Sequence, residues 1–178
     1  RRVAALSVEV GEQLGLSAAR LRNLAIGGLL HDIGKLSVPD SILQKPASLD
    51  EDEYALIKLH PERGRELLSE LGGFDECVRG LVLNHHERLN GHGYPRGLAA
   101  ANLDVETRIL AICDVYDALV SPRVYRAPWQ LGDALQLLRS EAGPVFDPRC
   151  FEALVQVLGQ NVAALRVSPP DDRLARAG

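Results

Sequence analysis

The segment DVETRILAICDVYDALVS, residues 104–121, carries the clearest helical pattern of the chain. Apolar side chains recur in it every three or four residues and form one stripe along a helix: Val105, Ile109, Ile112, Tyr116 and Leu119. Asp104 stands before the stripe as a helix N-cap, and Asp114 interrupts the otherwise apolar run. The segment predicts a long helix that buries one face and presents a carboxylate on its polar side.

Helical spacing continues through most of the chain, over residues 3–14, 18–30, 61–71, 75–87, 131–139 and 148–158. Ser48 and Glu51 form a capping-box pattern that predicts one more helix over residues 50–59. Residues 87–103 are rich in glycine and contain Pro95, which is typical of a loop. Because no segment alternates as a strand for long, the predicted fold class is all-α, a helical bundle.

Composition narrows the class of protein. The chain has 178 residues, 46% hydrophobic and 25% charged, which excludes disordered and collagen-like classes. A net charge of −4 gives no general attraction for nucleic acid or an anionic membrane, and neither a membrane-spanning run nor a signal peptide is visible. Three cysteines without paired spacing predict free thiols in a reducing compartment, the cytoplasm. We expect one soluble domain over residues 1–160 and a C-terminal tail over residues 161–178.

All five histidines lie between residues 31 and 92. His31 and Asp32 follow an apolar helix, His60 is expected to end another, and His85 with His86 is expected to end a third. A lone histidine in such a place is commonly a hydrogen-bonded helix end rather than a ligand. The grouping instead favours imidazoles and carboxylates that converge from neighbouring helices on a metal site.

Imidazole and carboxylate ligands without thiolate suit iron, manganese, zinc, nickel or cobalt. The candidate ligands outnumber what one open catalytic ion needs, so a dinuclear site bridged by Asp32 is the economical interpretation. Asp114 is expected to complete the site, the alternative being a carboxylate on a solvated face. Asp117 is open between a ligand and a residue that supports one from the second shell.

Four ordered motifs point to a family: HDIGK at 31–35, HPERG at 60–64, HHERLNGHGYPRGL at 85–98 and RILAICDVYDALVSPRVYR at 108–126. From residue 1 to about residue 158 the chain resembles the HD-GYP domain, a bacterial branch of the HD superfamily of metal-dependent phosphohydrolases. The resemblance implies an HD-superfamily helical bundle with an irregular GYP loop. It also implies a cyclic di-GMP phosphodiesterase that yields pGpG or GMP with two or three divalent ions, often iron or manganese.

The resemblance also assigns roles to single residues. The implied metal ligands, with the aspartate at 32 bridging, are His31, Asp32, His60, His85, His86 and Asp114. Lys35 is the motif lysine that contacts a phosphate, so Lys35 and Asp32 form the implied catalytic pair. The implied substrate-binding residues are Lys35, Arg123, Arg126, and the loop residues Gly91, Gly93, Tyr94 and Pro95. The alternative for the lysine and the two arginines is ordinary solvation at the surface.

Two departures from the family pattern stand out. Asn90 occupies a loop position where the family most often has aspartate. The earlier metal-binding histidine of the first helix has no counterpart here, since the match begins at "RRVA". The chain contains no methionine and Arg1 opens directly on an apolar-periodic run. We therefore expect a cut within the first helix that leaves the His31 side short of a ligand and weakens metal occupancy there.

Three functions remain in view. The first is a cyclic di-GMP phosphodiesterase serving as output module for an upstream sensor or receiver domain. The second is a catalytically weak or inactive domain that binds diguanylate cyclase (GGDEF) partners through the GYP surface. The third is an HD phosphohydrolase for another cyclic nucleotide. Retention of Lys35 and of the six candidate ligands favours the first, and a homodimer is left open.

Overall fold

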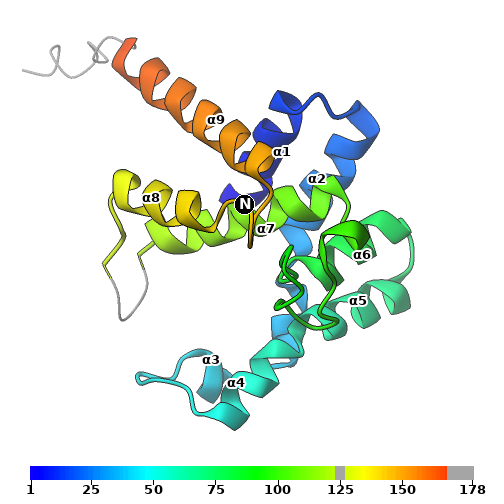
Figure 1. The fold of residues 1–178 in the computed structure, drawn as a ribbon. Helices are drawn as coiled ribbons and strands as arrows, with labels where there is room; N and C mark the ends of the chain where they lie inside the picture. The colour runs from blue at the N-terminus through cyan, green and yellow to red at the C-terminus, as the bar shows by residue number, and fades with distance from the viewer. Residues whose placement is uncertain (123–126, 168–178) are drawn as a thin grey trace, which may run out of the picture.

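A computed structural model describes residues 1–122 and 127–167, and these residues fold into helices joined by turns (Figure 1). The elements in chain order are α1 (Arg2–Gln13), α2 (Ala18–Leu30), the 3₁₀ turn η1 (Ile33–Ser37), α3 (Asp40–Leu43), α4 (Glu51–Lys58), α5 (His60–Leu71), α6 (Glu76–Asn84), η2 (Ala100–Asn102), α7 (Val105–Val120), α8 (Leu131–Glu141) and α9 (Pro148–Val167). The described residues contain isolated bridges but no β-strand. The predicted all-α class is confirmed. No described helix has the length and apolar character needed to cross a bilayer.

Helix ends differ from the sequence prediction in three places. The capping box of α4 uses Asp50 and Glu53 rather than Ser48 and Glu51: the Asp50 carboxylate accepts from the Glu53 backbone N–H, and Glu53 reciprocates. Asp50, two residues after Ser48, is the N-cap because its carboxylate accepts from a free backbone N–H of the first turn and its charge complements the helix dipole. His60 begins α5 instead of ending the helix before it. Helix α9 continues to residue 167, past the expected end at 158.

The larger hydrophobic core surrounds α7, which crosses the middle of the molecule in Figure 1. Its stripe residues Ile109 and Ile112 are fully buried, as the periodicity predicts. They share one cluster with buried side chains from five other helices: Val10, Leu24, Leu81, Leu138 and Leu154 are examples. Burial of such side chains stabilises a fold by roughly 1.5–3 kcal/mol each. The core therefore fixes α7, and with it Asp114, against α1 and α2.

A smaller cluster holds α5 against α6 through Leu68, Val78 and Val82. Next to it, η1 packs on α5 at a distance that only glycine permits. A Cβ atom added to Gly34 would lie 1.9 Å from the His60 carbonyl oxygen and 2.5 Å from the Gly64 backbone nitrogen. This backbone approach places the chain that follows α2 directly beside the start of α5.

One partly buried ion pair ties the residue before α9 to the first turn of α7. Arg108 donates to Asp147 Oδ2 (2.8 Å) and to the Ala100 carbonyl (2.7 Å). Asp147 Oδ1 also accepts from the Arg149 backbone N–H (2.9 Å) at the start of the helix. Burial alone raises the pKa of Asp147, but the Arg108 and Arg149 hydrogen bonds outweigh it, so the pKa lies below its ordinary value.

Asp147→Ala is expected to lower the free energy of unfolding at pH 7 by about 2–3 kcal/mol, because a buried arginine loses its charged partner. A lowered folded-state pKa means that this contribution is present above the unfolded value of about 4 and is lost as the pH falls through the folded value. Denaturant titrations between pH 7 and pH 3 measure it. The exposed Glu152→Gln on the same helix serves as the control. An equal stability gap at pH 7 and pH 3 would contradict the prediction.

Candidate metal centre

Four predicted ligands meet at one point. Asp32, His60, His85 and His86 each offer one ligand atom, and these atoms all lie within 4.8 Å of one another. The aspartate stands between α2 and η1, His60 opens α5, and the paired histidines follow α6. Three imidazoles and a carboxylate form a donor set suited to borderline divalent ions.

The backbone fixes which nitrogen faces the centre. The Nδ1 atom of His31 donates to the Gly28 carbonyl (2.9 Å), that of His60 to Ile57 (2.8 Å), and that of His85 to Val82 (2.8 Å). Each partner is the carbonyl three residues earlier, at the last turn of a helix. A carbonyl can only accept, so Nδ1 carries the proton and Nε2 of the neutral ring carries a lone pair.

The lone pairs provide a test of whether a cation fits. Nε2 of His60 lies 3.2 Å from Nε2 of His85. Burial lowers the pKa of both rings, that of His85 to about 3, so neither is protonated at neutral pH. Two buried lone pairs that face each other repel, and a positive ion between them would remove the repulsion. The residues present therefore fit a divalent metal ion.

Asp32 connects this group to a second pair of candidate ligands. Its Oδ1 lies 3.3 Å from Nε2 of His60, whereas its Oδ2 lies 3.5 Å from Nε2 of His31. The same His31 nitrogen lies 3.5 Å from Oδ1 of Asp114. All six predicted metal ligands thus come together, in two groups that share one carboxylate. Lys35 Nζ lies 2.8 Å from Oδ2 of Asp32, which brings the predicted phosphate contact to the same place.

The protonation of the candidate ligands differs between the two groups. Burial lowers the pKa of His86 far below its ordinary value, with the neighbouring His85 adding to the effect. Burial also acts to lower the pKa of His31, but the hydrogen bond with Asp114 and the nearby carboxylates outweigh it and raise the pKa. The same contacts overcome the burial of Asp114 and lower its pKa. At neutral pH the carboxylates are charged and His60, His85 and His86 are neutral, as metal ligation requires.

The GYP loop packs directly on a ligand. The Tyr94 ring stacks on the His86 ring with centroids 4.6 Å apart and 28° between the planes, and Tyr94 N–H donates to the His86 carbonyl (3.3 Å). Gly93 allows this approach, since a Cβ atom there would lie 2.5 Å from the Arg88 nitrogen and the Glu87 Cα. Gly91 has a positive φ of 75°, and the bond from Tyr94 to Pro95 is cis. The loop therefore lies where the resemblance implies, against the ligand cluster.

Glu87 was not predicted to have a role, although it lies in the quoted HHE motif. Its side chain is buried, and its two carboxylate oxygens accept from the backbone N–H groups of Arg96 (2.7 Å) and Leu98 (2.9 Å). The sequence feature that could have pointed to Glu87 is its position as a charged residue directly after two candidate ligand histidines. Glu87 thus holds residues 96–98, at the far end of the GYP loop, close to His85 and His86.

Glu87→Gln is expected to lower the free energy of unfolding by about 2 kcal/mol and to speed hydrogen exchange in the loop that Glu87 holds. One backbone N–H would face an amide NH₂ instead of an oxygen, and the loop would hold Tyr94 less firmly on His86. Thermal unfolding and hydrogen exchange of residues 91–98 measure the effect. Arg96→Ala keeps the donating backbone and is the control. Identical exchange in the wild type and the Glu87 variant would contradict the expectation.

Other predicted residues lie elsewhere. Arg123 and Arg126 fall outside the described residues. Asp117 forms an ion pair with Arg2 Nε (2.9 Å) at the start of α1 and contacts Ser121, so it is not among the converging groups of the described residues. Asn90 Oδ1 accepts from the His92 backbone N–H (3.0 Å), so asparagine closes this turn without a charge.

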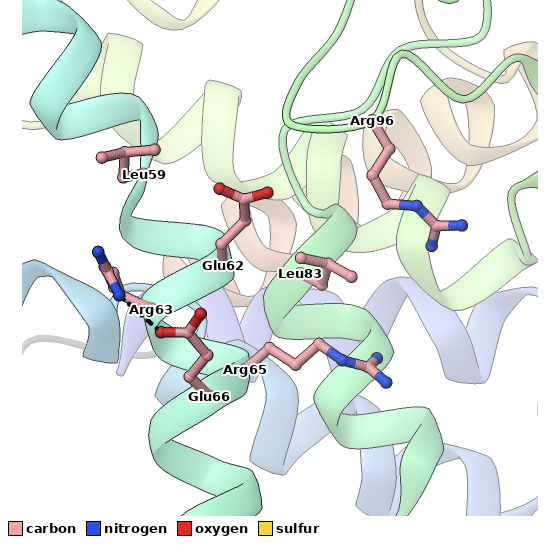
Figure 2. A pocket seen from close by; sticks show the side chains of 7 residues that line it. All are labelled: Leu59, Glu62, Arg63, Arg65, Glu66, Leu83 and Arg96. Carbon is pink, nitrogen blue, oxygen red and sulfur yellow. Dashed lines mark hydrogen bonds and ion pairs between the residues drawn. The ribbon is translucent and has the colours of Figure 1, made fainter.

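A cavity of about 430 Å³ on the outer side of α5 is distinct from the metal centre. Figure 2 shows its lining: Leu59, Glu62, Arg63, Arg65, Glu66, Leu83 and Arg96. Its charges pair locally, as in the Arg63–Glu66 ion pair (2.9 Å). Another cavity, of about 410 Å³, has Asp32 and Lys35 in its wall. The second cavity, not the first, gives a ligand room beside the centre.

Comparisons with known proteins agree with this geometry. A family model described as HD domain matches residues 1–150. The cyclic di-GMP phosphodiesterase response regulator RpfG of Xanthomonas campestris pv. campestris is 45% identical over 83% of this chain and 39% of its own length. The 3'3'-cGAMP-specific phosphodiesterase 1 of Vibrio cholerae serotype O1 is 40% identical over 88% of this chain and 36% of its own. The chain thus spans less than two fifths of these relatives.

Among solved structures, Bd1817, a HDG"Y"P protein from Bdellovibrio bacteriovorus, aligns with a TM-score of 0.73. The alignment covers 89% of this chain and 50% of that chain, at 24% sequence identity. This likeness establishes a shared helical fold.

Proposed function

Since this chain belongs to the HD domain family, we propose that it is a metal-dependent phosphodiesterase that hydrolyses cyclic di-GMP. The observation that carries the proposal is the pair of ligand groups that share Asp32, one with His60, His85 and His86 and the other with His31 and Asp114. Two ions held side by side are a common means of cleaving phosphate esters. The functional domain proposed is residues 1–160, with residues 161–178 as a tail.

Bound divalent ions supply charge neutralisation at the phosphoryl group and a water molecule of lowered pKa. In the proposed mechanism Asp32 would be a ligand shared by the two groups, because one of its oxygens faces His60 and the other faces His31. Lys35, one turn from Asp32, offers its ammonium group to a phosphoryl oxygen as negative charge develops there. Arg123 and Arg126 are proposed to bind the substrate phosphates. Gly91, Gly93, Tyr94 and Pro95 shape the wall beside His86.

The finer identity of metal and product belongs to the same proposal. The combination of imidazole and carboxylate ligands supports iron or manganese, and we propose two ions, with a third as an alternative. The proposed products are pGpG or GMP. A relative named for 3'3'-cGAMP at 40% identity supports a second candidate, hydrolysis of another cyclic dinucleotide at the same centre. The convergence of the six candidate ligands weighs against a domain that only binds partners.

Partners and location are also proposals. Diguanylate cyclase (GGDEF) domains are proposed to dock on the GYP loop, an upstream sensor or receiver domain to regulate the centre, and a homodimer remains an alternative. Cys77, Cys113 and Cys150 are free thiols. Burial raises the pKa of Cys150 to about 12, which keeps it an unreactive thiol. Free thiols support a cytoplasmic location.

The test is hydrolysis of cyclic di-GMP by anaerobically purified protein with added Fe²⁺ or Mn²⁺. The wild type is expected to turn over substrate, and His85→Ala combined with His86→Ala is expected to have no metal-dependent activity. The exposed His92→Ala keeps all proposed ligands and is the matched control. A wild type without turnover on any cyclic dinucleotide would overturn the proposal. Equal turnover in the double variant would overturn the metal assignment.

A further inference from the structure

A lysine and two tyrosines form a group at the rim of the metal centre. Lys58 Nζ lies 5.2 Å from the centre of the Tyr54 ring and 5.9 Å from that of Tyr94. Tyr54 and Lys58 are one turn apart on α4, whereas Tyr94 comes from the GYP loop. An ammonium group at these distances is attracted to the faces of both rings. The cation therefore bridges two elements that are distant in sequence.

The group has a fixed position relative to the ligands. Tyr94 stacks on the ligand His86, so the lysine lies one ring beyond the centre. Helix α4 leads through Leu59 into His60, and His60 Nδ1 donates to the carbonyl of Ile57, the residue before Lys58. The ligand and the lysine are thus held by the same turn of backbone. Figure 1 shows α3 and α4 at one end of the molecule, away from α8 and α9.

Among the described residues, the charge of Lys58 is not paired with a carboxylate, and the Tyr54 ring is only partly covered. Lys35 pairs with Asp32, and Lys45 pairs with Glu53. In the part of the chain that the structure describes, no carboxylate forms an ion pair with Lys58. Tyr54 is 49% exposed, so much of one aromatic ring faces solvent. Ring and cation together are the two chemical features that bind a nucleotide, whose base stacks and whose phosphate is an anion.

We propose that Tyr54 and Lys58 bind the half of the cyclic dinucleotide that is not being cleaved. The inference rests on the proposed function. A cyclic dinucleotide carries two phosphates and two purines, and the metal centre neutralises only the phosphate that reacts. Lys58 offers a cation to the other phosphate, while one purine stacks on the exposed Tyr54 ring. Helix α4 therefore positions a purine dinucleotide at the centre and contributes to the specificity for it.

The experiment compares cyclic di-GMP with bis(p-nitrophenyl) phosphate, a single diester that has neither purine nor second phosphate. In Tyr54→Ala and in Lys58→Met, KM for cyclic di-GMP is expected to rise about tenfold, the effect of one lost stacking or charge-assisted contact. The kcat value is expected to stay within about twofold. Hydrolysis of the aryl diester is expected to be unchanged. Tyr54→Phe keeps the ring and Lys58→Arg keeps the charge, so both are expected to restore the wild-type KM.

Leu56→Ala, exposed on the same helix, is the control for damage to α4. An unchanged KM for cyclic di-GMP in both Tyr54→Ala and Lys58→Met would overturn the inference and leave the proposed function standing. An equal loss on both substrates would also overturn it, because α4 would then support the centre only structurally. A wild type that cleaves neither diester would overturn the proposed function, and this inference with it.

Discussion

Gly34→Ala is expected to lower the free energy of unfolding by about 3 kcal/mol or more and to abolish metal binding. The new methyl group would lie 1.9 Å from the His60 carbonyl oxygen and 2.5 Å from the Gly64 nitrogen, both of them backbone atoms that cannot rotate aside. Relief requires η1 to move away from α5. That movement separates Asp32 from His60, whose facing atoms are now 3.3 Å apart.

Chemical denaturation and elemental analysis of the purified variant measure the two effects. Gly80→Ala is the matched control, since nothing lies within 4 Å of a Cβ atom at that helical position. Alanine there is expected to stabilise α6 by about 0.5–1 kcal/mol through its higher helix propensity. A Gly34 variant as stable as the wild type, with its metal retained, would contradict the close approach of η1 and α5.

Asp32→Asn is expected to reduce kcat/KM for the cyclic dinucleotide by more than about a hundredfold. Removing a partner that merely orients a ligand typically costs ten- to a hundredfold, and a shared ligand contributes to both positions. The amide keeps the shape but lacks the charge that its two oxygens present to His60 and His31. Lys35 loses its carboxylate partner as well. The fold is expected to remain, because the Asp32 side chain is half-exposed.

Metal content per chain and thermal unfolding separate the outcomes for this variant. Loss of metal, with a melting temperature equal to that of the metal-free wild type, is the expected result. Asp40 is an exposed aspartate in the wall of the cavity that Asp32 and Lys35 also line. The control variant Asp40→Asn is expected to leave both metal content and rate unchanged. Full metal content in Asp32→Asn would show that the aspartate is not a shared ligand.

Periodicity predicted the helices because a buried stripe repeats at 3.6 residues whatever the partner. The fully buried Ile109 and Ile112 on α7 are examples. Short elements escaped prediction: η1 and α3 span too few residues for a stripe to appear. Helix ends depend on single hydrogen bonds, and Asp50 displaced Ser48 as a cap for that reason. The extent of α9 depends on tertiary contacts that a local pattern does not contain.

The candidate ligands were predictable because histidines are rare in this chain and cluster in it. Their division into two groups about Asp32 was an interpretation of ligand number, and the distances to His31 and His60 now support it. Glu87 and Lys58 were missed for a common reason. Each acts through a contact distant in sequence or in another element, one with the Leu98 backbone and the other with the Tyr94 ring.

Three helices, α2, α4 and α6, direct their carboxyl ends at the ligands, because His31, His60 and His85 each bond to a last-turn carbonyl. Aligned peptide dipoles give such an end a partial negative charge of about half a unit. The backbone alone therefore creates a potential that attracts cations. The same three rings hydrogen-bond to carbonyls at helix ends, so the entropy cost of ordering them is met when the chain folds. The three imidazoles are therefore already oriented before a metal ion binds.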